Sequence, residues 1–268
     1  MKLKILDFDG LLTDINKEAQ PIIQGFLREL YADIGLTKKQ GEQAFRNFNE
    51  QLGVEDAWHF HGHDTVRWDA DPYIQASTAA SKLYKHYREE LDETTRSNNL
   101  STWFRKHQQE QQNKKVFWRE DVKYFLNTLL EETNPVIVTN SKTLLVQKKI
   151  RSLGLNKNLP VYGKANKYEI DDTHTELPEH MNIEGMSRPI LLRRKHYYEI
   201  IKQLIPEGEQ AIFAGDIYEF DLALPEHLGH KTILAFSQGN DAYEKRHTQK
   251  NPQGKTANSL LEALEYIR

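Results

Sequence analysis

Two aspartates stand one residue apart near the start of the sequence. Asp7 and Asp9 belong to the run Asp7-Phe8-Asp9-Gly10, which directly follows the apolar-rich residues 3–6. Removing ionised carboxylates from water is costly, so a pair beside a core strand usually serves a cation, a shared proton or catalysis. Side chains two residues apart in an extended segment face the same side, so both carboxylates can address one reacting atom.

Polar residues also follow two later apolar runs. Thr139 and Asn140 come directly after a β-branched run, and Asp216 and Asp221 come after another apolar run. Carboxylates suit a hard cation such as Mg²⁺, hydroxyl and amide groups can donate to phosphate oxygens, and a free carboxylate can act as a nucleophile. This set of side chains is typical of phosphoryl transfer.

A basic residue should complete such a site. Arg193, Arg194 and Lys195 lie at the predicted start of a helix that precedes the Asp216 segment. A cation there could neutralise charge on a transferring phosphoryl group. We favour Lys195 because it stands just before the helix, with Arg193 on the same side if the segment is extended. Arg194 stays open as an alternative.

Strand and helix patterns alternate along the part of the chain that carries these residues. This alternation predicts an α/β fold with a doubly wound, mainly parallel sheet, whose ligands bind beyond the carboxyl ends of the strands. The polar residues should therefore converge on one crevice. The expected strands are residues 3–6, 136–138, 160–163, 210–214 and 231–235, and the expected helices include 122–130, 144–153, 198–204 and 260–264.

The stretch from residue 15 to 112 has a different character. Its apolar residues recur at helical spacing, it is rich in charge, and Thr37 with Gln40 resembles a capping box. We therefore predict a helical cap domain over residues 15–112 and an α/β core domain formed by residues 1–14 and 113–268. Within the core, residues 164–188 could form a hairpin insertion that lines or shields the site.

Composition excludes several classes of protein. With 36 Lys and Arg against 39 Asp and Glu, the net charge of -3 gives no general attraction to nucleic acid or anionic lipid. The sequence contains no cysteine, which rules out disulfides and thiolate chemistry. No apolar stretch approaches the length of a membrane span, and a strand begins at Lys2, so we expect a cytoplasmic protein. The oligomeric state is not defined by the sequence.

The arrangement resembles the haloacid dehalogenase (HAD) superfamily of aspartate-nucleophile hydrolases. The likeness covers residues 1–14 and about 116–235, and it departs from the family pattern in the basic cluster, where proline does not follow a lysine. The resemblance implies a Rossmann-like core with a cap inserted between the first and second motifs. Four motifs carry it in the expected order, at residues 7–14, 136–140, 193–195 and 215–221.

This resemblance assigns a role to each matching residue. Asp7 would be the nucleophile that forms an aspartyl-phosphate, and Asp9 the acid and base that moves the proton. Metal binding would fall to the carboxylates of Asp7 and Asp216 and the main-chain carbonyl of Asp9, with Asp221 holding the metal shell from nearby. Phosphate oxygens would be bound by Gly10, Thr139, Asn140, Lys195 and Arg193.

The expected function is a Mg²⁺-dependent phosphomonoester hydrolase acting on a small phosphorylated metabolite. In this superfamily the dehalogenases lack the second aspartate of the first motif, so Asp9 favours a phosphate ester. Two alternatives stay open, a phosphotransferase of the phosphoglucomutase kind and a catalytically silent protein that binds a phosphorylated ligand.

Three histidines occupy alternate positions within the predicted cap. If the chain were extended there, His59, His61 and His63 would face one way and could bind a transition metal or contribute to substrate recognition. Ordinary surface or packing roles are the competing interpretation.

Overall fold

The computed structural model describes residues 2–53, 55–111, 115–236 and 242–268. Its main sheet has six strands in the order β10-β9-β8-β1-β4-β5, and every neighbouring pair is parallel. The predicted α/β fold with a doubly wound parallel sheet is confirmed. The strands are β1 (Lys4–Leu6), β4 (Pro135–Val138), β5 (Val161–Tyr162), β8 (Ile212–Gly215), β9 (Lys231–Ala235) and β10 (Gly254–Ala257).

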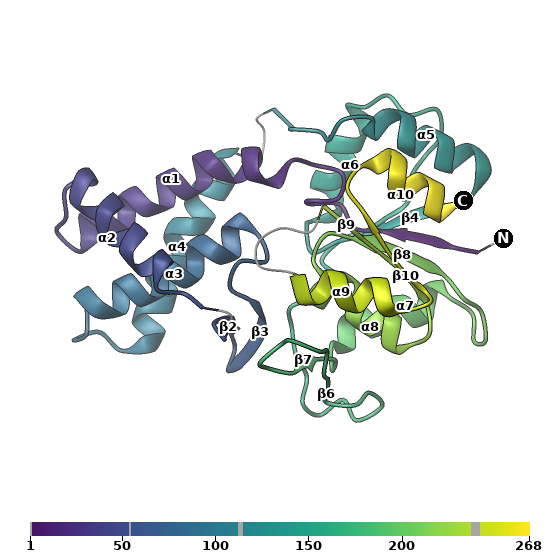
Figure 1. Ribbon diagram of the computed structural model, residues 1–268. Coiled ribbons are helices and arrows are strands. Elements are labelled where there is room, and N and C mark those ends of the chain that lie inside the picture. Colours follow the sequence, from purple (N-terminus) through teal and green to yellow (C-terminus); the bar gives the residue numbers. More distant parts are fainter. Residues whose placement is uncertain (1, 54, 112–114, 237–241) are drawn as a thin grey trace.

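Both faces of this sheet are covered by helices (Figure 1). Alternate strand residues point to opposite faces, so Leu6 packs in one apolar cluster and its neighbour Ile5 in the other. The first face is covered by α5 (Val122–Glu132), α6 (Thr143–Arg151) and α10 (Leu260–Ile267). The second is covered by α7 (Lys195–Leu204), α8 (Ala223–His227) and α9 (Ala242–Lys250).

Residues 15–111, hereafter the cap, lie to one side of the sheet (Figure 1). Four helices pack together there through apolar residues such as Phe26, Leu30 and Leu83. Thr37 and Gln40 form the predicted capping box at the start of the second helix. A β-hairpin, which the sequence pattern did not predict, completes the cap. The elements are α1 (Ile15–Asp33), α2 (Lys38–Glu50), β2 (Ala57–Phe60), β3 (His63–Arg67), α3 (Pro72–Tyr87) and α4 (Glu93–Gln111).

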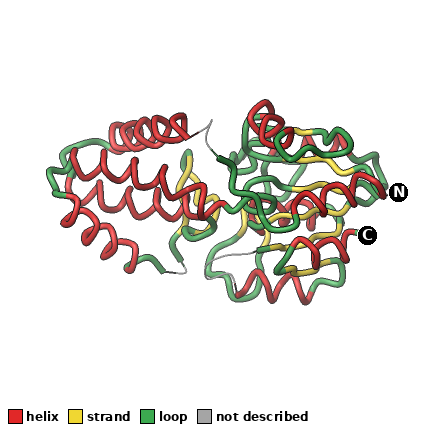
Figure 2. The backbone as a smooth tube through the Cα atoms, turned by 90° about the horizontal axis from the view of Figure 1, so that it is seen from above, coloured by secondary structure: helices red, strands yellow, loops and turns green. Residues whose placement is uncertain are grey.

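The chain enters and leaves the cap through two paired segments, which we call the neck. Thr13 forms an antiparallel bridge with Trp118, and the amide of Asp14 donates to the carbonyl of Phe117 at 2.7 Å. The chain termini lie together at the far end of the sheet domain, away from the cap (Figures 1 and 2). The two chain connections between the cap and the core thus lie together, near the carboxyl end of β1.

A second hairpin lies beneath the sheet domain in Figure 1. It consists of β6 (His180–Met181) and β7 (Ile190–Leu191), which pair antiparallel. Within the predicted 164–188 insertion, residues 168–170 are not a strand, and the second strand of the observed hairpin lies beyond residue 188. Among the described residues, no helix is both long enough and apolar enough to cross a lipid bilayer.

Candidate active site

The site forms where the sheet changes its direction of winding. From β1 the chain builds outward to β4 and β5, and it later returns to build β8, β9 and β10 on the other side of β1. Ligands of doubly wound sheets bind at such a switch point, beyond the carboxyl ends of the strands. Asp7 follows β1 and Asp216 follows β8, so both carboxylates lie at this point.

Three carboxylates meet there. Oxygens of Asp7, Asp216 and Asp221 all lie within 4.8 Å of one another. Asp221 belongs to a short π-helix (η1, Tyr218–Leu222), where its Oδ2 accepts from the amide of Ile217 at 3.1 Å. The structure therefore brings together three of the acidic residues predicted from the sequence.

The electrostatics of this cluster suit a cation. Burial, reinforced by the charges of Asp221 and Asp7, raises the pKa of the Asp216 carboxyl well above its usual value. Burial likewise raises the pKa of Asp7, against the lowering effect of Lys167. Oδ1 of Asp216 is buried without a hydrogen-bond partner among the described residues. Clustered carboxylate oxygens, one of them unpartnered, fit the oxygen preference of Mg²⁺.

Two glycines allow the acidic side chains to come this close. Gly10 has φ +88°, and a Cβ atom there would lie 1.9 Å from Oδ2 of Asp216. A Cβ atom on Gly215 would lie 2.4 Å from Oδ2 of Asp221. Side chains at these two positions would occupy the space that the carboxylates need.

Asp9 lies apart from the acidic cluster and faces the residues after β4. Its Oδ2 accepts hydrogen bonds from Ser141 Oγ at 2.6 Å and from Thr139 Oγ1 at 3.3 Å. Its carboxylate is not among the clustered oxygens, so any metal binding by Asp9 would use the main-chain carbonyl. The two carboxylates of the first motif thus have different partners.

Lys167 supplies the cation of the site, and the sequence analysis missed it. Its Nζ lies 2.7 Å from Oδ1 of Asp7 and 2.8 Å from Oδ1 of Asp221. Burial alone would lower the pKa of this lysine, but the charges of Asp221 and Asp7 raise it overall. The ammonium group therefore stays protonated between two carboxylates.

Asn140 holds the segment that carries this lysine. Its Oδ1 accepts a hydrogen bond from the amide of Lys167 at 2.7 Å, so this oxygen serves positioning. Tyr197 holds the main chain of Asp221, the second carboxylate that pairs with Lys167, because its hydroxyl donates to the carbonyl of Asp221 at 2.9 Å. Lys167 comes five residues after the end of β5 and behind Lys164, so the rule that polar residues directly follow apolar strands does not single it out.

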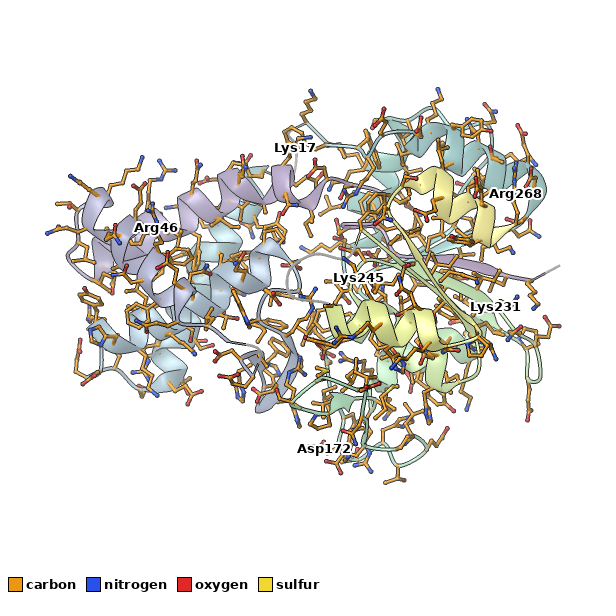
Figure 3. The ribbon with its side chains drawn as sticks, viewed as in Figure 1. Lys17, Arg46, Asp172, Lys231, Lys245 and Arg268 are labelled. Atoms are coloured by element: carbon orange, nitrogen blue, oxygen red, sulfur yellow. The ribbon has the colours of Figure 1, made fainter. Side chains whose placement is uncertain are left out.

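The predicted cations Lys195 and Arg193 lie elsewhere, and the choice of them was wrong. Lys195 is half exposed and pairs with Asp171 at 3.6 Å. Arg193 donates to the carbonyls of Leu177 at 3.4 Å and of Asp172 at 3.0 Å. Figure 3 labels Asp172 at the outer edge of the segment before α7. The β6–β7 hairpin carries the chain outward there, away from the sheet edge.

Arg194, the third candidate, points inward but does not pair with the acidic cluster. Its side chain is fully buried and donates to main-chain carbonyls, including that of Lys167. Burial lowers the pKa of Arg194 to about 10.

The three cap histidines do not converge. His59 Nδ1 lies 3.1 Å from Asp64 Oδ1, and His63 Nε2 lies 3.4 Å from Asp172 Oδ2. His61 lies in the turn with φ +47°, and its ring stacks on that of Phe60 with the ring centroids 4.1 Å apart. Within the described part of the chain, the histidines do not belong to a group of side chains placed to hold a metal. The turn breaks the extended geometry that the metal hypothesis required.

The cap adds polar groups beside the acidic cluster. Asp71 precedes α3, and its Oδ1 accepts from the amide of Ile74 at 2.7 Å. Burial raises the pKa of Asp71 to about 6, with a further contribution from the charge of Asp9. Burial also raises the pKa of Tyr73, again aided by nearby carboxylates that include Asp9. Ala70 and Ile74 pack against Ile217, which places this part of the cap on the Asp216 loop.

The chain resembles known proteins in its three-dimensional fold. A scan against protein-family models and a search among curated proteins find no match. Solved structures, however, match over nearly the whole chain. A predicted phosphoglycolate phosphatase from Haemophilus somnus has 16% identity and a TM-score of 0.57, with 100% of this chain and 98% of that chain covered.

Two further structures show the same likeness. A protein described as a phosphatase from Clostridium difficile has 11% identity and a TM-score of 0.58, with coverage of 100% and 98%. YfnB from Bacillus subtilis, regarded as a HAD hydrolase and bound to magnesium, has 16% identity and a TM-score of 0.52, with coverage of 99% and 98%. The chain therefore has the fold of the HAD-like hydrolases, which confirms the motif-based resemblance at the level of the fold.

Proposed function

We propose that this protein is a Mg²⁺-dependent phosphomonoester hydrolase that acts on a small phosphorylated molecule through an aspartyl-phosphate on Asp7. The observation that carries the proposal is the meeting of Asp7, Asp216 and Asp221 with the ammonium group of Lys167 at the sheet's switch point. The magnesium-bound state of YfnB and the phosphatase descriptions of the other two neighbours support it.

In the first step a carboxylate oxygen of Asp7 attacks phosphorus, and the bond from phosphorus to the leaving oxygen breaks. Asp9 gives its proton to that oxygen. In the second step Asp9 takes a proton from water, the water oxygen attacks phosphorus, and the bond to Asp7 breaks. Inorganic phosphate leaves, and both aspartates return to their starting states.

The surrounding residues make these steps possible. Mg²⁺ bound by Asp7, Asp216, Asp221 and the carbonyl of Asp9 would supply positive charge that lets a phosphate approach the carboxylates. Lys167 orients Asp7 and offsets part of its charge. The Gly10 turn and the residues after β4 would contact the phosphate oxygens.

Asp9 is held ready for proton transfer by its hydrogen bonds. Ser141 and Thr139 fix its carboxylate outside the acidic cluster, so it is free to face the leaving group. The presence of Asp9 also favours phosphate esters over organic halides. The cap side chains Asp71 and Tyr73 lie close enough to Asp9 for its charge to raise their pKa values, and they would accept hydrogen bonds from or donate them to a small polar substrate.

The test is the initial rate of inorganic phosphate release from a panel of phosphomonoesters, with Mg²⁺ or with EDTA. We expect turnover that requires Mg²⁺ and that is lost in Asp7→Asn. Asp64→Asn is the matched control, because Asp64 is an exposed cap carboxylate that pairs with His59. Unchanged turnover in Asp7→Asn would refute the mechanism. Transfer of phosphate between substrate positions, or binding without turnover, would favour the two alternatives.

A further inference from the structure

Arg194 has an unusual set of partners for a buried arginine. Its side chain is 0% exposed, and it donates hydrogen bonds to main-chain carbonyls in three segments of the chain. Nη1 donates to the carbonyl of Lys167, Nη2 to that of Thr65 at 3.0 Å, and Nε to that of Leu191 at 3.1 Å. The planar guanidinium has its donors in a rigid fork, so one side chain reaches all three acceptors.

These contacts join the cap to the cation of the site. Thr65 belongs to β3 of the cap hairpin and is fully buried, and β3 lies against β7. Lys167 is fixed at three points, with its amide on Asn140, its carbonyl on Arg194 and its ammonium group on the two carboxylates. Of these three, the Arg194 contact is the one shared with the cap.

A second pair of contacts strengthens the same boundary. The amide of Arg67, on β3, donates to Oε1 of Glu219 at 2.8 Å, and Nη2 of Arg188 lies 2.7 Å from the same oxygen. Glu219 is in the π-helix that carries Asp221. The cap hairpin is therefore bound both to the lysine segment and to the segment of Asp221, the acid that pairs with that lysine.

We propose that Arg194 is a positioning residue that makes the placement of Lys167 depend on docking of the cap hairpin. The inference rests on the proposed function and deepens it. When β3 is docked, the guanidinium is held on both sides and fixes the Lys167 carbonyl, which aims the ammonium group at Asp7. When β3 leaves, the guanidinium loses its Thr65 acceptor, and the lysine segment loses its anchor to the cap.

The variant that tests this is Arg194→Lys, which keeps the charge but cannot span three acceptors. Arg67→Lys is the matched control, since Arg67 is a buried arginine at the same boundary whose guanidinium pairs with Asp69 and Glu244. With p-nitrophenyl phosphate and Mg²⁺ we expect Arg194→Lys to lower kcat by about tenfold or more, because small misplacement of a reacting group is that costly. Arg67→Lys should keep kcat within about threefold while losing comparable thermal stability.

Two measurements do not need turnover. Crystal structures should show the Lys167 ammonium displaced from Asp7 and Asp221 in Arg194→Lys and retained in Arg67→Lys, and inorganic phosphate should bind more weakly to the former. In the unaltered protein, Mg²⁺ with inorganic phosphate should slow hydrogen exchange in residues 63–67 together with residues 165–168, since coupling between two sites is reciprocal.

An Arg194→Lys variant with kcat unchanged and Lys167 in place would overturn the proposal. So would phosphate that protects residues 165–168 from exchange and leaves residues 63–67 as they were. If the proposed enzymatic function were wrong, the experiments would give a different result from a failure of the Arg194 proposal. The unaltered protein would then release no phosphate in an Asp7-dependent way, while the crystallographic and exchange measurements would still decide the role of Arg194.

Discussion

Replacing Asp216 by asparagine should stabilise the metal-free protein and abolish its response to Mg²⁺. Asp216 is 2% exposed, its Oδ1 lacks a hydrogen-bond partner among the described residues, and it lies beside two other carboxylates. A buried polar group without a partner costs about 1–3 kcal/mol. Asparagine keeps the shape, removes the charge and adds two donors for Asp7 and Asp221, so Asp216→Asn should recover a cost of this order.

The sign of the pH dependence follows from the direction of the pKa shift. Burial, then the charges of Asp221 and Asp7, raises the folded-state pKa of Asp216, so the folded state holds this proton more tightly than the unfolded state does. Stability from this group is present at low pH and is lost as pH rises above the unfolded value of about 3.9 and through the raised folded value. The advantage of Asp216→Asn should therefore be near zero at about pH 4 and largest near pH 8.

Thermal and chemical unfolding in EDTA at both pH values measure the effect. A gain of this size raises Tm by roughly 2–4 °C per kcal/mol in a chain of about this length. Added Mg²⁺ should stabilise the unaltered protein and leave Asp216→Asn unchanged, and the exposed Asp64→Asn should behave as the unaltered protein does. If Asp216→Asn were the less stable protein in EDTA at pH 8, or if its advantage did not vary with pH, the reasoning would be refuted.

Three other substitutions test neighbouring features. Gly10→Ala places a Cβ 1.9 Å from Asp216 Oδ2 at φ +88°. It should therefore lower the unfolding free energy by about 1–3 kcal/mol and weaken Mg²⁺ binding. Denaturation and calorimetry measure the two effects, and full stability would contradict the prediction. Ser141→Ala removes the 2.6 Å hydrogen bond to Asp9 and should lower kcat about tenfold with little change in KM, measured by steady-state kinetics. An unchanged kcat would show that Asp9 does not need this hydrogen bond for proton transfer. Arg67→Met removes a guanidinium that lies 3.4 Å from the buried carboxylate of Glu244, so denaturation should show a loss of about 3–5 kcal/mol. A neutral result would contradict this.

The sequence predicted the site best where an apolar strand is followed directly by a residue of the site. The strand before Asp7 and the strand before Asp216 are short apolar runs, and the residues that follow parallel strands lie at the same edge of the sheet. Their convergence was therefore predictable, and β1 and β8 are indeed neighbours. The cation was not found in this way. Lys167 follows β5, a strand of only two residues, while the conspicuous basic cluster at 193–195 follows a hairpin that turns outward.

Other elements depend on contacts that a local pattern does not reveal. β10 has the sequence Gly-Lys-Thr-Ala and is a strand because it pairs with β9 along its whole length. α9 is a mostly polar helix that buries Tyr243 against the sheet. The cap hairpin is held by buried contacts to the core, such as the bond from Arg67 to Glu219, whose partners are far apart in the sequence.

The neck gives the cap a topological independence. Because Thr13 pairs with Trp118, the insertion between them is a closed loop whose two ends are held together by the core. The entropy of closing such a loop grows only with the logarithm of its length, so lengthening or shortening the insertion changes core stability little. An insertion of a different size can therefore occupy the same neck while the aspartates beneath it keep their places.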